Sequence, residues 1–211
     1  MERRIEAIIF DLGGVLIDFD HTVAARRISQ FSDKTAEEIF ALFFDSALVV
    51  NFEEGKIGPE DFFKKIKETI NLRIDYEVFL PIWNEIFFQT EGNKEVLELA
   101  RCLKGRYEIC VLSNVNTLHF NYIRDNFRIF DVFPRVIASC ELGMRKPHPL
   151  IYRRALEELG VRDAAGVFYT DDRAELVEAA ALIGIKARVF KNAPQLKKDL
   201  FNLGVTIQQD G

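Results

Sequence analysis

Short apolar runs alternating with helical patterns constrain this chain more than any other feature of its sequence. A run of this length bounded by glycine or polar residues predicts a buried strand, and strand, helix, strand repetition predicts a parallel sheet with helices on both faces. The predicted strands are Ile5–Phe10, Tyr107–Leu112, Arg135–Ala138, Gly166–Thr170 and Lys186–Phe190. The predicted helices between the later strands are Asn93–Leu103, Pro149–Leu159 and Ala174–Ile183. We therefore expect an α/β fold with a doubly wound parallel sheet.

The stretch from residue 20 to residue 90 interrupts this pattern. Apolar residues, many of them phenylalanines, recur there at helical spacing, and no segment is typical of a strand. The periodic positions predict four helices, marked by Ile28 and Phe31, by Ile39, Phe40 and Phe43, by Phe62, Phe63 and Ile66, and by Phe79, Ile82, Trp83, Ile86 and Phe87. We expect a core formed by residues 1–19 and 91–211, and an all-helical insertion formed by residues 20–90.

Composition excludes several classes of function. The net charge of -5 and the absence of a basic stripe argue against a nucleic-acid partner. No run approaches the ~20 apolar residues of a membrane-spanning helix, and the first strand is too short for a secretory signal. Cys102, Cys110 and Cys140 are an odd set without metal-ligand spacing, so we expect reduced thiols in a cytoplasmic protein. Whether the protein is a monomer or a homodimer stays open.

Polar residues follow the predicted strands at the point where each strand ends. They are Asp11 after the first strand, Ser113 and Asn114 after the second, Lys146 after the third, and Asp171 and Asp172 after the fourth. Ligands bind outside the carboxyl ends of the strands in doubly wound folds, so we expect these side chains to meet in one crevice. Singly, each has a simpler interpretation as a turn residue or a helix cap.

Their chemistry suits a phosphate ester. An ordinary aspartate has a pKa of about 3.9, so Asp11 is expected to be ionised at neutral pH and able to attack phosphorus. Asp11, Asp171 and Asp172 supply the hard oxygen ligands that Mg²⁺ prefers, and this ion screens the repulsion between nucleophile and phosphate. Lys146 adds a positive charge for the phosphoryl transition state.

The segments IIFDLGGVL, VLSN, LGMRKP and FYTDD, in this order, resemble the four motifs of the haloacid dehalogenase superfamily. The resemblance covers about residues 5 to 190, with LSNVNTLH and LGMRKP most similar to bacterial sugar-phosphate phosphatases of the glucose-1-phosphatase kind. It implies a Rossmann-like core with a helical cap of the C1 type. It also implies roles for the site residues. Asp11 and Lys146 are expected to be catalytic, and Ser113, Asn114 and Lys146 are expected to bind phosphate. Mg²⁺ is expected to bind to Asp11, Asp172 and the Gly13 carbonyl group, with Asp171 acting through water or from a second layer.

The chain departs from the family pattern at three positions. The family's general acid/base stands two residues after the nucleophile, where this chain has Gly13. Leu176 stands where the family often has Asn or Asp, which leaves Glu175 as the nearest polar residue. His148 replaces the usual acidic residue after Lys-Pro, and a lone loop histidine is typically exposed.

Candidates for substrate selection carry weaker signals. His119 follows the predicted phosphate-binding residues and faces either the crevice, a helix cap or solvent. Asp18 and Asp20 lie in the turn that leads into the cap, where turn residues are the simpler interpretation. Trp83 and Asn84 are candidates for the inner face of the cap, although packing in the core is the more usual role of a tryptophan.

Together these observations predict a Mg²⁺-dependent phosphatase acting on a small phosphorylated metabolite, with sugar phosphates among the candidates, through an aspartyl-phosphate intermediate. The main alternative is a non-catalytic phosphate-binding or regulatory protein, which the glycine at position 13 allows. A haloacid dehalogenase is a weaker alternative, because its monoanionic substrate needs no metal and the acidic pair would repel it. A phosphoacceptor signalling domain places its acidic pair and acceptor in the reverse order.

Overall fold

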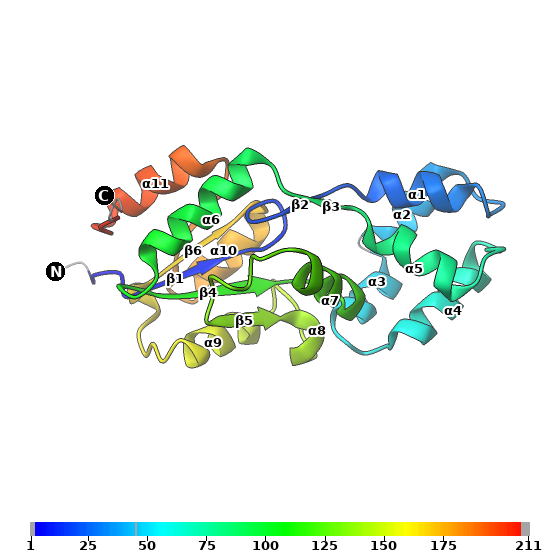
Figure 1. The fold of residues 1–211 in the computed structure, drawn as a ribbon. Helices are drawn as coiled ribbons and strands as arrows, with labels where there is room; N and C mark the ends of the chain where they lie inside the picture. Colours follow the sequence, from blue (N-terminus) through cyan, green and yellow to red (C-terminus); the bar gives the residue numbers. More distant parts are fainter. Residues whose placement is uncertain (1–2, 45, 208–211) are drawn as a thin grey trace.

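The computed structural model describes residues 3–44 and 46–207 (Figure 1). Its described strands include a five-stranded parallel sheet in the order β5-β4-β1-β6-β7. The bounds are β1 Ala7–Phe10, β4 Glu108–Ser113, β5 Arg135–Ala138, β6 Val167–Asp171 and β7 Lys186–Val189. Each predicted strand overlaps an observed one, and the prediction of an α/β fold with a doubly wound parallel sheet is confirmed.

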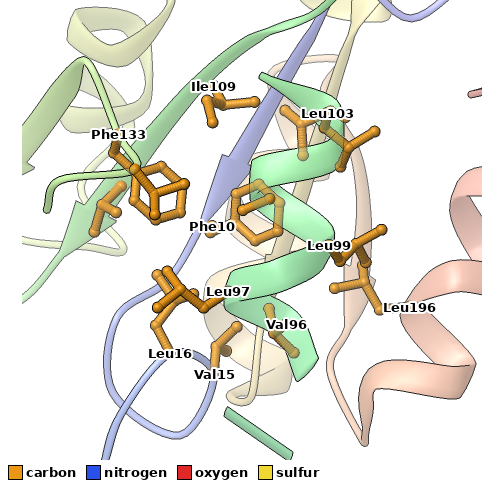
Figure 2. Packing of buried hydrophobic residues seen from close by; sticks show 14 of the residues in the cluster. Phe10, Val15, Leu16, Val96, Leu97, Leu99, Leu103, Ile109, Phe133 and Leu196 are labelled. Atoms are coloured by element: carbon orange, nitrogen blue, oxygen red, sulfur yellow. The ribbon is translucent and has the colours of Figure 1, made fainter. Parts of the chain in front are cut away.

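Helices cover both faces of the sheet. Their bounds are α6 Glu91–Leu103, α7 Thr117–Asn126, α8 Ser139–Leu142, α9 Pro149–Glu158, α10 Ala174–Leu182 and α11 Ala193–Asn202, with a short 3₁₀ turn η1 at Ala164–Gly166. Alternate residues of β1 face opposite layers. Ile8 and Phe10 pack with α6 and α11, where Figure 2 shows Phe10 against the side chains of α6, and Ile9 packs with α9 and α10. Burial on both faces explains why β1 is apolar at every position.

Five helices lie between residues 20 and 86 in the described part of the chain. Their bounds are α1 His21–Ser29, α2 Ala36–Phe43, α3 Ala47–Glu53, α4 Pro59–Thr69 and α5 Tyr76–Asn84. They bury a separate apolar cluster that includes Phe52, Phe62 and Trp83. The expected number of four was wrong because α3 is short and buries only Val49 and Phe52, too few positions for a visible helical period.

A two-stranded antiparallel ribbon connects this helical part with the rest. It pairs β2 Asp18–Phe19 with β3 Phe87–Phe88, and the two connections run side by side in Figure 1. The expectation that this stretch has no strand, and that Ile86 and Phe87 continue a helix, is wrong because α5 ends at Asn84. Phe87 instead pairs across the ribbon with Phe19. The domain boundaries at 19/20 and 90/91 flank the ribbon and stay a prediction.

The three cysteines carry free thiols, and Cys110 is fully buried. Among the described helices, none has the length and apolar character that crossing a membrane requires.

Candidate active site

The polar residues that follow the strands meet at the carboxyl edge of the sheet. Asp11 follows β1, Ser113 ends β4, Asp171 ends β6, and Lys146 lies in the loop between α8 and α9. A crevice of about 310 Å³ opens there, and its lining includes Asp11, Gly13, Ser113, Asn114, Lys146 and Asp172. The structure therefore brings the predicted side chains together, with the nucleophile candidate on the central strand, where the strand order reverses.

The ammonium group of Lys146 is buried and contacts four oxygen atoms. Its Nζ lies 2.8 Å from Asp11 Oδ1, 2.6 Å from Asp171 Oδ2, 3.0 Å from the Leu112 carbonyl oxygen and 3.1 Å from the Tyr169 hydroxyl oxygen. Burial lowers the pKa of Lys146, but attraction to the two carboxylates outweighs burial and raises the pKa above its ordinary value. Lys146 therefore stays charged and fixes the position of Asp11.

Both carboxylate oxygens of Asp171 are engaged inside the protein. Oδ2 accepts from Lys146 and from the Tyr169 hydroxyl group, and Oδ1 accepts from the Arg173 backbone N–H at 2.9 Å. Burial raises the pKa of Asp171, but Lys146 and these hydrogen bonds lower it below the ordinary value. Asp171 is thus the counter-ion of Lys146, and its predicted part in binding a metal stays a prediction.

Asp11 has a pKa well above that of an ordinary aspartate. Burial raises its pKa to about 8, repulsion from Asp171 adds to the rise, and Lys146 and the Leu12 backbone N–H oppose it. The expectation that Asp11 has an ordinary pKa is therefore wrong. The physical reason is that one ammonium group cannot fully offset two buried carboxylates. A further cation beside Asp11 would lower its pKa and favour the carboxylate.

The neighbouring Asp172 makes such a cation possible. Asp11, Asp171 and Asp172 each place one carboxylate oxygen within 4.8 Å of the others. Partial burial, followed by repulsion from Asp171, raises the pKa of Asp172, so this group also gains from a positive partner. Gly14 allows the close approach, because its φ is +70° and a Cβ there would lie 2.5 Å from Asp172 Oδ2. Three clustered carboxylates fit a hard divalent ion such as Mg²⁺.

A comparison with protein families decides the assignment, because the model of haloacid dehalogenase-like hydrolases matches residues 5–184. The chain belongs to this family. It is 30% identical to the sesquiterpene phosphatase astK of Aspergillus oryzae over 88% of this chain and 89% of that protein. It is 21% identical to the D-ribitol-5-phosphate phosphatase of Bacteroides thetaiotaomicron, over 93% of this chain and 97% of that protein.

A solved structure supports the same assignment. The HAD family enzyme bt-2542 of Bacteroides thetaiotaomicron, in complex with magnesium and inorganic phosphate, superimposes with a TM-score of 0.78 at 26% identity. The match covers 89% of this chain and 94% of that chain. The resemblance to the haloacid dehalogenase superfamily that the four motifs indicated is thus confirmed, and the protein is a hydrolase of that family.

In this haloacid dehalogenase-like hydrolase, a side chain from another element occupies the space beside Gly13, two residues after Asp11. A Cβ on Gly13 would lie 2.8 Å from Cε1 of Phe19, so the Phe19 ring takes the space of a side chain at position 13. Phe19 is 40% exposed at the mouth of the crevice. The role of the Gly13 carbonyl group as a metal ligand stays a prediction.

Asn114 uses its side chain to hold Lys146. Its Nδ2 donates to the Lys146 carbonyl oxygen at 2.9 Å, and its Oδ1 accepts from the Lys146 backbone N–H at 2.8 Å. The side chain is therefore committed to the protein, and only its backbone N–H is left for the predicted contact with phosphate. Ser113 is 4% exposed and lines the crevice, and its predicted phosphate contact stays a prediction.

His119 is a structural residue. Asn116 Oδ1 accepts from the His119 backbone N–H, so the amide nitrogen Nδ2 of Asn116 is the atom that faces the ring. It donates to His119 Nδ1 at 3.0 Å. The ring proton is therefore on Nε2, which donates to the Trp83 carbonyl oxygen at 3.0 Å. Burial lowers the pKa of His119 to about 3, so the ring is neutral. His119 connects α7 of the core with α5 of the helical insertion, and the surface position weighed from the sequence is wrong.

The other weak candidates have the simpler roles. Asp20 caps α1 by accepting from the Thr22 backbone N–H at 2.8 Å, and Asp18 belongs to the ribbon. His148 is exposed at the start of α9. Glu175 is exposed and pairs with Arg173 at 2.6 Å, so it does not replace the polar residue missing at Leu176.

An inner cavity of about 80 Å³ continues from the crevice toward the helical insertion. Phe19, His21, Phe43 and Ser113 line both spaces, and Trp83 lines the inner one while also packing in the core of the insertion. Sequence analysis missed Phe19 and His21. Their only signal was their place where the chain enters the insertion, beside the nucleophile loop.

Several contacts hold the insertion against the core beside this cavity. Besides the bond between His119 and Trp83, the Ser139 hydroxyl group donates to the Glu53 carbonyl oxygen at 2.6 Å. The carboxylate of Glu53 pairs with Arg145 at 3.2 Å, and both side chains are largely buried. The structure thus shows the insertion lying against the crevice.

Proposed function

We propose that the protein is a Mg²⁺-dependent hydrolase of phosphate monoesters that uses Asp11 as the nucleophile. The observation that carries the proposal is the cluster of Asp11, Lys146, Asp171 and Asp172 at the switch point of the sheet. Membership of a hydrolase family agrees with it. The relatives named as phosphatases and the magnesium and phosphate bound to the similar enzyme support the same class of reaction.

Asp11 and Asp172 are the residues that we expect to hold Mg²⁺, with the Gly13 carbonyl group, and with Asp171 acting through water. A bound Mg²⁺ supplies charge that offsets the repulsion between carboxylate and phosphate. Asp11, whose pKa burial raises, would be held in its ionised form by such a cation.

The residues of the chain then carry the transfer. Asp11 Oδ1 accepts from Lys146 Nζ and, at 2.7 Å, from the Leu12 backbone N–H, so we assign the attack on phosphorus to Oδ2. Ser113 and the backbone N–H of Asn114 hold a phosphate oxygen, and Lys146 offsets the negative charge of the transition state. Attack forms the bond between Asp11 Oδ2 and phosphorus and breaks the bond between phosphorus and the ester oxygen. The alkoxide that leaves takes a proton from solvent, and water then hydrolyses the acyl phosphate on Asp11 to inorganic phosphate.

The substrate is a small phosphorylated metabolite, a class that includes the sugar phosphates considered from the sequence. One relative is named a sesquiterpene phosphatase and another a D-ribitol-5-phosphate phosphatase, so the relatives alone do not choose between apolar and polyol substrates. We also propose a cytoplasmic protein, monomeric or homodimeric, without a nucleic-acid or membrane partner.

Hydrolysis of acetyl phosphate with and without Mg²⁺ tests the proposal. We expect turnover that disappears with EDTA, and an Asp172→Ala variant that needs much more Mg²⁺ because it lacks a direct ligand. Glu175→Ala is the matched control, since this exposed carboxylate pairs only with a neighbour on its own helix end. Binding of phosphate without any turnover would instead favour the non-catalytic alternative. Metal-independent release of halide from a haloacid would favour a dehalogenase.

A further inference from the structure

The inner cavity offers few hydrogen-bonding groups that are free to bind a ligand. Its walls include the apolar side chains of Leu12, Ile17, Phe43, Val49 and Phe87. None of the described residues that line it is a lysine or an arginine. A carboxylate or a second phosphate placed in this inner cavity would therefore lose its hydration without gaining a cationic partner, because Arg145 and Arg173 line only the outer crevice.

Most polar side chains of the lining are already committed. Asn116 and His119 bond each other, and His119 also bonds the backbone of Trp83. Asn114 holds the backbone of Lys146, and Glu53 pairs with Arg145. These groups have little capacity left for the hydroxyl groups of a polyol.

Two polar atoms on lining side chains remain to be satisfied. His21 Nδ1 and Trp83 Nε1 are buried and have no hydrogen-bond partner among the described residues. Their rings lie 6.3 Å apart. An indole N–H only donates, whereas a neutral imidazole nitrogen donates or accepts. One hydroxyl group that reached both would therefore accept a hydrogen bond from Trp83 Nε1 and either donate to or accept from His21 Nδ1. A buried polar atom without a partner is unfavourable, so a ligand that supplies one gains affinity.

Resting on the proposed function, we propose that this cavity selects phosphate monoesters of compact, uncharged, largely apolar alcohols that carry no more than one or two further oxygen atoms. The phosphoryl group lies over Asp11 in the crevice. The carbon skeleton lies among Phe19, Phe43 and Phe87. A single oxygen of the skeleton lies near Trp83 and His21. Polyol phosphates are poor substrates because most of their hydroxyl groups lose water without a replacement partner.

Two primary alkyl phosphates with similar leaving-group basicity test the selection directly. With Mg²⁺ present, kcat/KM for cyclohexylmethyl phosphate is expected to exceed kcat/KM for ribitol 5-phosphate by at least ~10²-fold. Acetyl phosphate serves as the reference, because its acyl group is too small to need the cavity. Equal or faster hydrolysis of ribitol 5-phosphate, together with hydrolysis of acetyl phosphate, overturns the inference and leaves the proposed function standing.

Binding gives a readout that does not depend on turnover. Trp83 is the only tryptophan of the 211-residue sequence, so its fluorescence reports on the cavity. Cyclohexylmethanol, which does not absorb in the relevant range, is expected to produce a saturable change in emission, and ribitol is expected to produce none. If no phosphate ester is hydrolysed, the proposed function fails, and this titration still decides the inference. A response to ribitol but not to cyclohexylmethanol overturns it.

A pair of matched substitutions tests whether the inner cavity is responsible for the selection among leaving groups. Val49→Phe fills the inner cavity, so the ratio of kcat/KM for cyclohexylmethyl phosphate to that for acetyl phosphate should fall by about tenfold. Val78→Phe adds the same volume on α5 at a position that is 48% exposed and outside the cavity lining, so it should leave the ratio within about twofold. Equal ratios in the two variants contradict the inference. If Val49→Phe does not fold, the fluorescence titration of the unmodified protein decides.

Discussion

The ring of Phe19 lies where a side chain at position 13 would project, with Cε1 2.8 Å from the Cβ position of Gly13. Related phosphatases are expected to have an acid/base residue at position 13. In this protein, Gly13 and the ring of Phe19 place an apolar surface where that proton donor would be. The leaving alcohol consequently meets no obvious general acid. We expect a preference for good leaving groups, such as acyl and aryl phosphates, over primary alkyl phosphates.

The first prediction concerns restoration of the acid. Gly13→Asp alone should accelerate the hydrolysis of alkyl phosphates less than Gly13→Asp combined with Phe19→Ala, because the Phe19 ring must first move away from the new Cβ. Gly13→Asp combined with Phe19→Ala should be ~10²-fold faster on an alkyl phosphate than Phe19→Ala alone, the usual scale of general acid catalysis. Initial rates of phosphate release measure both.

Phe88→Ala is the control for this pair, because Phe88 lies in the same ribbon and is 48% exposed. Combined with Gly13→Asp it should give no gain. Equal acceleration by Gly13→Asp with and without removal of the Phe19 ring would contradict the steric argument.

The second prediction is that Mg²⁺ binding releases a proton at pH 7. Burial raises the pKa of Asp11 to about 8, and the bound cation favours its ionised form, so affinity for Mg²⁺ should increase as the pH rises from about 6 to about 8. Calorimetric titration in two buffers with different ionisation enthalpies measures the released proton. Asp11→Asn should release a smaller fraction of a proton, because only Asp172 then has a raised pKa among the expected ligands, and a buffer-independent enthalpy in the unmodified protein would contradict the raised pKa of Asp11.

The third prediction concerns Asn114, which holds the backbone of Lys146 through two hydrogen bonds. Asn114→Ala should lower kcat for acetyl phosphate by roughly 10- to 10²-fold, because a small displacement of the ammonium group weakens transition-state stabilisation. Asn126→Ala is a suitable control, since Asn126 also donates from its side chain to a backbone carbonyl group, that of Tyr122, but far from the crevice. An equal loss of kcat in both variants, after correction for unfolded protein, would remove this role from Asn114.

The fourth prediction is a loss of stability in acid that comes from His119. Burial lowers its pKa from 6.5 to about 3, so between these values the unfolded state binds more protons than the native state. The contribution of His119 to the free energy of unfolding is therefore fully present above about pH 6.5 and is lost as the pH falls toward 3. The loss is about 3 kcal/mol between pH 7 and pH 4. Urea unfolding at several pH values should show a shallower pH dependence in His119→Gln than in the unmodified protein. Exposed His148→Gln should keep the steep dependence, and equal slopes in all three would contradict the prediction.

The sequence predicted the sheet and the meeting of the polar residues for a simple reason. Parallel strands bring their carboxyl ends to one edge, so Asp11 and Lys146 meet although they are 135 positions apart. The same logic located Asp171, but it did not reveal that both of its oxygens are bonded inside the protein. Nor did it reveal the pKa of Asp11, because desolvation depends on everything packed around the group.

The predictions from sequence were wrong where the local pattern and the tertiary contacts disagree. Helical spacing continued through Phe87, but pairing with Phe19 across the ribbon takes precedence there. Helix α3 buries too few residues to show a period. Phe19 and His21 carry no motif, and their importance appears only when the ribbon places them over the crevice.

A covalent phosphoryl group on Asp11 is the central claim of this account. Because no residue at position 13 activates water, the second step should be slow and the phosphorylated protein should accumulate. The most direct measurement is intact-protein mass spectrometry after mixing with Mg²⁺ and acetyl phosphate and quenching in acid, followed by peptide mapping. We predict one phosphoryl group, located on Asp11, absent with EDTA and absent in Asp11→Asn. Rapid hydrolysis of acetyl phosphate by the unmodified protein with no phosphoryl group at any time after mixing, or undiminished hydrolysis by Asp11→Asn, would contradict the account.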